Sequence, residues 1–239
     1  MLSLILCAAL QAAKPEKPLD PKDPASVVEH AVYNTRSQKN YETAFTSRMK
    51  ATGSDAFERQ GTCLWMAPGL LSLHYTGSGR EEMNVIRAGR DVWVYQGEWL
   101  TAEEAFKDGA GRGIQNPDEV MAVLSQHASR AKFDAKGEID LEIPGADLVK
   151  IINNPEVDPL KSSLTVHVEK DKDLRVKSLT LKASVTFKDP GSPAAAYEGR
   201  VDVTAFNGAK PIQAVDAKGK EIPLSKSMRQ AIEAFRTKP

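Results

Sequence analysis

The side chains that most often perform catalysis or bind metals are scattered along this sequence. Its four histidines include no pair spaced to share a metal ion on one helix face: His30, His74, His127 and His167. Two acidic dipeptides, Glu81-Glu82 and Glu103-Glu104, place carboxylates side by side in the chain. Because adjacent residues of a strand face opposite ways, both pairs indicate solvated charge and not a catalytic acid with its base.

Two glycine-containing segments share features with enzyme motifs but lack their context. Gly77-Ser78-Gly79 is no nucleophile elbow, because no glycine lies two residues before Ser78. Asp108–Gln115 (DGAGRGIQ) has the glycines of a phosphate-binding loop, but no Lys-Ser/Thr follows them, and Pro117 intervenes before the next predicted helix. We therefore expect a surface loop there, no cofactor, no metal and no enzymatic activity.

Composition narrows the class of protein further. The chain has 239 residues, with 32 Lys and Arg balanced by 32 Asp and Glu. A protein that binds the nucleic-acid backbone usually has a basic excess, so nucleic acid is not an expected partner. No internal run approaches the roughly 20 apolar residues of a membrane span, and the length suits one large domain.

The N-terminus has the pattern of a secretory signal. Leu2–Leu10 is apolar and is followed by small residues that end at Ala13, which predicts a signal peptide over residues 1–13. The alternative is a short membrane-proximal anchor. Residues 14–24 are charged and proline-rich, which predicts an extended linker. Removal of the signal would leave Cys63 as the only cysteine, and we expect a monomer with that thiol buried in a strand.

Period-2 alternation and turn residues predict two meanders of β-strands. The first comprises strands near residues 41–52, 57–66, 70–75, 83–87, 92–95 and 98–100. The second has strands near 139–143, 164–168, 179–187 and 197–205, each with one apolar side. Helices are expected after the cap Asp23, over Thr101–Lys107 with a capping box, after Asn116, over Ala146–Asn153, and in a C-terminal extension over residues 216–239.

The first meander also carries a family resemblance. A long strand ending in Trp65-Met66-Ala67-Pro68-Gly69, then an apolar strand, then a polar hairpin into Val92–Tyr95, resembles the bacterial lipoprotein-carrier and glycolipid-binding lipoprotein superfamily. The order of elements is similar from about Ala25 to Gln213. The resemblance implies a single α+β domain, which we place at residues 25–215, with an open antiparallel half-barrel sheet wrapped around two or three helices. It also implies an apolar cavity for acyl chains and no catalysis.

The resemblance and the alternation together predict a function and a site. The chain would be a periplasmic or cell-envelope carrier of lipid or lipoprotein acyl chains, with an inner-membrane protein as loading partner. Alternatives are an envelope-stress or regulatory binding module, with the C-terminal helix as its partner-binding strip, and a secreted enzyme whose site is not recognised. The predicted cavity wall consists of Trp65, Leu71, Leu73, Met83, Val85, Trp93, Leu179, Leu181 and Val185.

Overall fold

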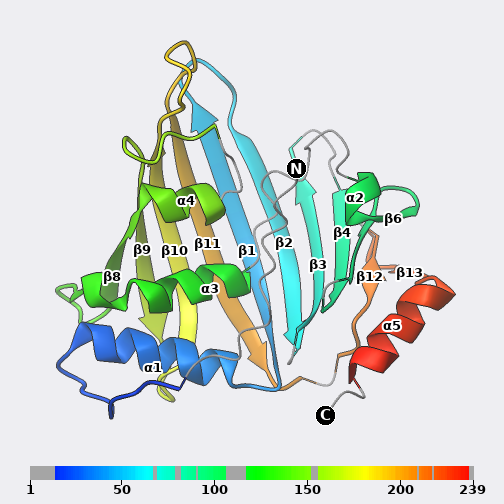
Figure 1. Ribbon diagram of the computed structural model, residues 1–239, viewed down its shortest axis with the longest axis horizontal. Coiled ribbons are helices and arrows are strands. Elements are labelled where there is room, and N and C mark those ends of the chain that lie inside the picture. The colour runs from blue at the N-terminus through cyan, green and yellow to red at the C-terminus, as the bar shows by residue number, and fades with distance from the viewer. Residues whose placement is uncertain are drawn as a thin grey trace.

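The computed structural model describes residues 14–66, 69–78, 82–89, 91–105, 117–151, 156–208, 210–216 and 218–236. These residues form one open antiparallel sheet of eleven strands in the order β6-β5-β4-β3-β2-β1-β11-β10-β9-β8-β7, together with α-helices and a small two-stranded sheet (Figure 1). The α+β open-sheet architecture predicted from the sequence is confirmed.

The first meander follows the predicted strand positions closely. Turn residues between the apolar runs mark where each strand ends. The predicted strand 57–66 has the same first and last residues as the observed strand Phe57–Met66. The strands of this meander are β1 (Asn40–Ala51), β2 (Phe57–Met66), β3 (Leu70–Gly77), β4 (Glu82–Ala88), β5 (Asp91–Tyr95) and β6 (Trp99–Thr101). The short helix α2 (Ala102–Ala105) follows, and the capping box is confirmed: the Thr101 backbone N–H donates to Glu104 Oε2 over 2.9 Å.

The second meander joins the first at the centre of the sheet. Its strands are β7 (Ala131–Phe133), β8 (Ile139–Pro144), β9 (Ser163–Lys170), β10 (Val176–Val185) and β11 (Ala195–Phe206). The last of these pairs along its length with β1, from Tyr41 opposite Phe206 to Ala51 opposite Ala195. The first strand of the first meander, β1, and the last strand of the second, β11, therefore join the two meanders into one continuous open sheet.

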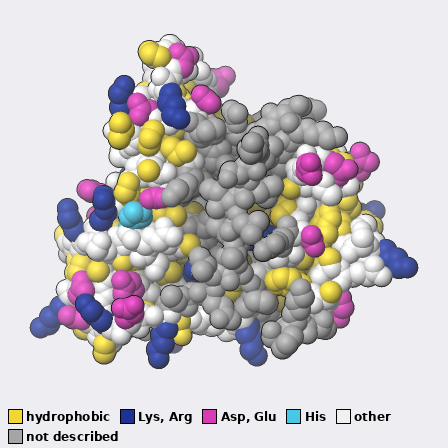
Figure 2. All heavy atoms as spheres, viewed as in Figure 1, with side chains coloured by type: hydrophobic (Ala, Val, Ile, Leu, Met, Phe, Trp, Pro, Cys, Tyr) yellow, Lys and Arg dark blue, Asp and Glu magenta, His cyan; other side chains and the backbone are white. Residues whose placement is uncertain are grey.

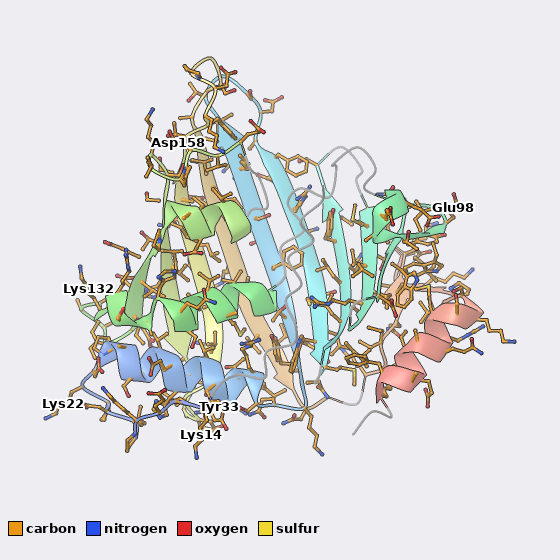
Figure 3. The ribbon with its side chains drawn as sticks, in the orientation of Figure 1. Lys14, Lys22, Tyr33, Glu98, Lys132 and Asp158 are labelled. Carbon is orange, nitrogen blue, oxygen red and sulfur yellow. The ribbon has the colours of Figure 1, made fainter. Side chains whose placement is uncertain are left out.

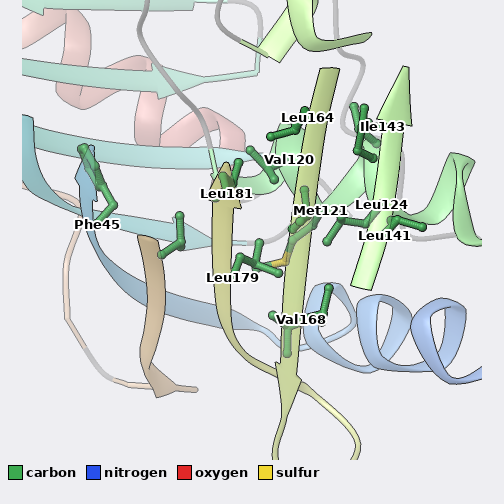
Figure 4. Packing of buried hydrophobic residues seen from close by; sticks show 14 of the residues in the cluster. Phe45, Val120, Met121, Leu124, Leu141, Ile143, Leu164, Val168, Leu179 and Leu181 are labelled. Atoms are coloured by element: carbon green, nitrogen blue, oxygen red, sulfur yellow. The ribbon is translucent and has the colours of Figure 1, made fainter. Parts of the chain in front are cut away.

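Three helices cover the second meander on the concave side of the sheet (Figure 1). They are α1 (Pro24–Arg36), α3 (Pro117–Gln126) and α4 (Gly145–Ile151), and the short 3-10 helix η1 (Ala128–Arg130) follows α3. The predicted cap of α1 is confirmed, because the Asp23 carboxylate accepts from the Ala25 backbone N–H over 3.0 Å. Val120, Met121 and Leu124 of α3 face the aliphatic side chains of β8–β10 (Figure 4).

The turn between β9 and β10 fixes α1 to the sheet. Thr35 of α1 accepts from the Val176 backbone N–H over 2.8 Å, and the Arg175 guanidinium lies 4.2 Å from the Phe206 ring centroid. Within the turn, burial raises the pKa of Asp171, but hydrogen bonds from the Arg175 backbone and guanidinium outweigh it, so the pKa lies below its ordinary value.

The C-terminal segment crosses to the opposite, convex face of the first meander. The sequence predicts a helical extension there, whereas residues 214–222 first form a hairpin of β12 (Ala214–Val215) and β13 (Glu221–Ile222). Helix α5 (Lys226–Arg236) follows and buries Met228 and Ile232 against the sheet. The hairpin forms because its strands can pair locally across the turn at Gly219 while Ala214 and Ile222 bury their side chains.

Lys22, Lys132 and Glu98 lie at the edges of the molecule in the view of Figure 3. Within the described residues, no helix is long and apolar enough to cross a membrane. The predicted signal peptide and the glycine-rich segment Asp108–Gln115 lie outside the described residues.

Candidate functional site

The concave face of the first meander is the candidate site. Strand alternation sends Cys63 and Trp65 of β2 to this face, and Leu64 and Met66 to the convex face, as their separate hydrophobic clusters show. The neighbouring strands continue the concave surface through cross-strand pairs. These pairs are Trp65 with Leu71, Cys63 with Leu73, Leu73 with Val85, Tyr75 with Met83, and Val85 with Val94. We call this surface, with Tyr41 and Phe45 of β1, the concave wall.

Most side chains of the concave wall are buried. Leu73 is 2% exposed, Val85 4% and Cys63 3%, which confirms the predicted burial of the thiol. The wall belongs to the same hydrophobic cluster as the residues beneath the helices, so apolar contact is continuous across the concave side. Figure 2 shows hydrophobic side chains at the left and at the right of this one view of the molecule.

Several side chains of the concave wall are aromatic. Tyr41 and Trp65 stack with ring centroids 5.1 Å apart and an interplanar angle of 24°. Phe45 lies across the backbone at Gly61, where an added Cβ would come within 2.8 Å of the Phe45 ring and 2.7 Å of Tyr75 Cβ. Only glycine fits at position 61, because an added Cβ would also clash with the His74 backbone carbonyl oxygen, which is held in the pairing of β2 with β3.

Polar groups are set into this apolar surface. Thr43 is 1% exposed, and its hydroxyl has no hydrogen-bond partner among the described residues. It lies opposite Cys63 in the pairing of β1 with β2. The Tyr75 hydroxyl donates to Met83 Sδ over 3.2 Å, and the Arg59 guanidinium lies 5.1 Å from the Tyr75 ring centroid. The wall can therefore contact both hydrocarbon and a polar group.

The structure brings together most of the residues that the sequence predicts as cavity wall. Trp65, Leu71, Leu73, Met83 and Val85 share the concave wall. The residues predicted from the second meander belong to the same cluster but lie in the half of the sheet against which the helices pack: Leu179, Leu181 and Val185. Figure 4 shows Leu181 near Val120 of α3.

Trp93 does not join the other predicted residues. It pairs with Ile86 of β4, and both side chains pack in the convex cluster with the C-terminal segment. Its neighbours Val92 and Val94 face the concave side instead. Both faces of β5 are apolar, so alternation within the strand could not show which face belongs to the wall.

Sequence reasoning missed the contributions of β1 and part of β2. Tyr41, Thr43 and Phe45 occupy alternate positions of β1, and Arg59 lies on the same face of β2 as Cys63 and Trp65. The signal was present in the alternation, since counting back from Trp65 in steps of two reaches Arg59. The pairing of β1 with β2 was needed to bring the β1 residues to the same surface.

The histidines form local hydrogen bonds. His127 Nε2 lies 2.7 Å from Asp147 Oδ2, linking the end of α3 to α4, and His167 Nδ1 lies 2.9 Å from Asp140 Oδ1. Across the described ranges, no group of three or more His, Cys, Asp or Glu could hold a metal ion.

The fold is similar to that of several solved bacterial protein structures. The lipoprotein LppX of Mycobacterium tuberculosis aligns with a TM-score of 0.43 and 11% identity, over 79% of this chain and 97% of that one. A LolA-superfamily protein of Nitrosomonas europaea aligns with a TM-score of 0.33 and 10% identity, over 77% and 94%.

A third likeness is to a larger protein. MucB, in the MucA/MucB complex of Pseudomonas aeruginosa, aligns with a TM-score of 0.36 and 12% identity, over 84% of this chain and 64% of that one. With TM-scores below 0.5, all three are likenesses of fold alone. The sequence itself matches no family profile and no curated protein.

Proposed function

We propose that this protein is a non-enzymatic carrier in the periplasm or cell envelope that binds acyl chains of lipids or lipoproteins on its concave wall. The observation that carries this proposal is the composition of the wall. Aromatic rings and embedded polar groups lie on β1–β3, beside a separate half of the sheet where α1, α3 and α4 pack on aliphatic side chains.

Acyl-chain binding on such a wall would be driven by burial of hydrocarbon. Each CH₂ group buried from water contributes about 0.8 kcal/mol, so contact with several wall residues would offset the cost of taking an acyl chain out of the membrane. The wall side chains are buried in the structure, so a ligand reaches them only if the concave side opens. A site that closes over its own apolar surface suits reversible loading and release.

The apolar side of the C-terminal helix is occupied within the chain. The alternative of a regulatory binding module assigns a partner protein to this helix, but Met228 and Ile232 of α5 are buried against the convex face. The carrier proposal uses the concave side instead, with an inner-membrane loading partner and a monomeric carrier.

The test is a pair of substitutions at directly opposed positions of the wall. Leu73 and Val85 pair across β3 and β4, so Leu73→Glu and Val85→Phe alter one small area by charge and by volume. We expect both variants to keep their fold and lose uptake of a fluorescent fatty acyl probe. Leu181→Glu is the matched control in the helix-covered half, and we expect it to unfold, since it buries a charge in a dedicated core.

Melting temperature and probe uptake are measured for all three variants. Normal probe uptake in stably folded Leu73→Glu and Val85→Phe would contradict binding at the wall. Unfolding of both wall variants as well as the control would favour an ordinary hydrophobic core. A copurified lipid identified by mass spectrometry from the wild-type protein would name the natural ligand class directly.

A further inference from the structure

A cationic side chain lies on the concave face at one end of the wall. Arg59 is on β2, two strand positions from Gly61 on the same face, and its guanidinium lies 4.7 Å from the Phe57 ring centroid and 5.1 Å from that of Tyr75. The Nε atom of Arg59 is itself buried. A charge held among aromatic rings at an apolar surface interacts more strongly with an anion than one in water does.

The residues directly opposite Arg59 on the two neighbouring strands are small. Its cross-strand partners are Ser47 on β1 and Gly77 on β3, and both have small or absent side chains. The wall extends from Arg59 toward Trp65, six residues along the same strand. At about 3.3 Å per residue this is about 20 Å, a length suited to a long acyl chain lying along the strand.

We propose that the concave wall takes lipids with an anionic headgroup, with Arg59 binding the headgroup while the acyl chain lies toward Trp65. The inference rests on the proposed acyl-chain binding and adds the charge of the ligand and its orientation. A guanidinium offers a planar fork of donors that matches phosphate and carboxylate oxygens, which explains why this position suits an arginine.

A second arginine on the same face provides an alternative location for the headgroup. Arg87 of β4 pairs with Leu71, near the opposite end of the wall, and its Nε–H donates to the Gly89 carbonyl oxygen over 2.9 Å. That donor is already used within the turn, and Gly89 also contacts the ring of Phe235 from α5. Arg59 is the candidate because its guanidinium lies against two aromatic rings at the end of the apolar surface, and the experiment separates the two residues.

The experiment compares two lipids with the same acyl chain. Palmitoyl-lysophosphatidylglycerol carries a net negative charge, and palmitoyl-lysophosphatidylcholine carries none. Each displaces a neutral fluorescent acyl probe from the full-length protein. We expect the anionic lipid to bind about tenfold more tightly, as one charge-assisted contact provides. Arg59→Gln should remove that preference and leave the binding of the neutral lipid unchanged within about twofold.

Three further variants control the measurement. Arg59→Lys retains the charge and should keep a preference for the anionic lipid. Arg48→Gln removes an arginine of the neighbouring strand that pairs with Glu58 over 3.3 Å and is 54% exposed, and it should change nothing. Arg87→Gln should also retain the preference. If Arg87→Gln loses it while Arg59→Gln keeps it, the assignment to Arg59 is overturned.

The remaining outcomes are equally decisive. Equal binding of the two lipids by the wild-type protein overturns the inference but leaves acyl-chain binding in place. Displacement by neither lipid overturns the proposed function as well. If Arg59→Gln does not fold, the test is instead how the wild-type protein's preference for the anionic lipid depends on salt concentration. The preference should then fall severalfold between about 0.05 and 0.5 M salt, and a preference that persists contradicts binding by charge.

Discussion

The two halves of the concave face are built from different residues. Beneath the helices, the side chains of β8–β10 are aliphatic: Ile139, Leu141, Ile143, Leu164, Val166, Val168, Leu179 and Leu181. On β1–β3 the same face carries four aromatic residues of the hydrophobic cluster, Tyr41, Phe45, Trp65 and Tyr75, together with Thr43 and Arg59. A dedicated core gains nothing from an embedded hydroxyl or guanidinium, because burying polar groups costs free energy. This contrast in composition is the observation behind the proposed acyl-chain site on β1–β3.

The two halves of the sheet also differ in what lies on their convex faces. The convex face of the first meander is backed by the β12–β13 hairpin and α5, which pack against Leu70 and Ile86. In the second meander, ion pairs such as that between Arg200 and Asp202, at 2.7 Å, lie on the convex side instead. The C-terminal segment therefore covers the convex face of the wall half, whereas the convex face of the second meander carries charged side chains.

The largest expected effect tests the two halves directly. Leu181→Ala should lower the free energy of unfolding by about 2–5 kcal/mol, because it leaves a cavity between the sheet and α3. Leu73→Ala should cost about 2 kcal/mol, the transfer term alone, since a surface that can open need not keep an empty cavity. Urea unfolding measures both values, and equal losses would remove the distinction between core and wall.

The next effect concerns the contact between β4 and the β12–β13 hairpin on the convex face. Asn84 is 1% exposed; its side-chain amide donates to the Val215 carbonyl oxygen over 2.8 Å and accepts from the Val215 N–H over 3.1 Å. Asn84→Leu should cost about 1–3 kcal/mol, because the backbone groups of Val215 lose their partner, and should leave acyl-probe uptake intact.

Ser72→Ala is the matched control on the same face. It removes one hydrogen bond, to the Gln213 carbonyl oxygen, near the edge of the contact. Its cost should stay within about 0.5 kcal/mol. Loss of probe uptake in Asn84→Leu without unfolding would show that the two faces are coupled through the sheet.

A smaller effect on the free energy of unfolding is expected when the pH is lowered, through Asp171 in the helix-covered half. The pKa of Asp171 is lower in the folded protein than its ordinary value of 3.8, so the ionised form stabilises the fold. This contribution is present at neutral pH and is lost as the pH falls below about 4 and through the folded pKa. Asp171→Asn should therefore be less stable than wild type at pH 7, with the difference disappearing in acid. A difference independent of pH would contradict the charge interaction with Arg175.

The smallest effect is kinetic and reports on the wall alone. Cys63 should react slowly with a thiol reagent in the native state and rapidly in urea, because its side chain is 3% exposed. Saturation with an acyl probe should slow the native reaction further, because the ligand would lie over the thiol. Leu181→Ala should leave this protection unchanged, and faster labelling with probe bound would place the ligand elsewhere.

The sequence by itself determined most strands and the helix starts. Strict alternation in residues such as Leu164, Val166 and Val168 left only one way to bury the apolar side of the second meander. Local chemistry also set the caps at Asp23 and Thr101, because their hydrogen bonds reach only two or three residues. Fold class followed from these elements together with the family resemblance.

Only the tertiary structure decided which apolar face became the wall. Where both faces of a strand are apolar, as in β4 and β5, periodicity groups Met83 with Val85 and Trp93 with Tyr95 but does not relate one group to the other. The register between neighbouring strands decides which group lies on which face. It placed Trp93 on the convex face and Met83 and Val85 on the concave face. The approach of β1 to β2 then brought Thr43 and Arg59 onto one surface, because pairing between strands is a long-range choice that local patterns do not encode.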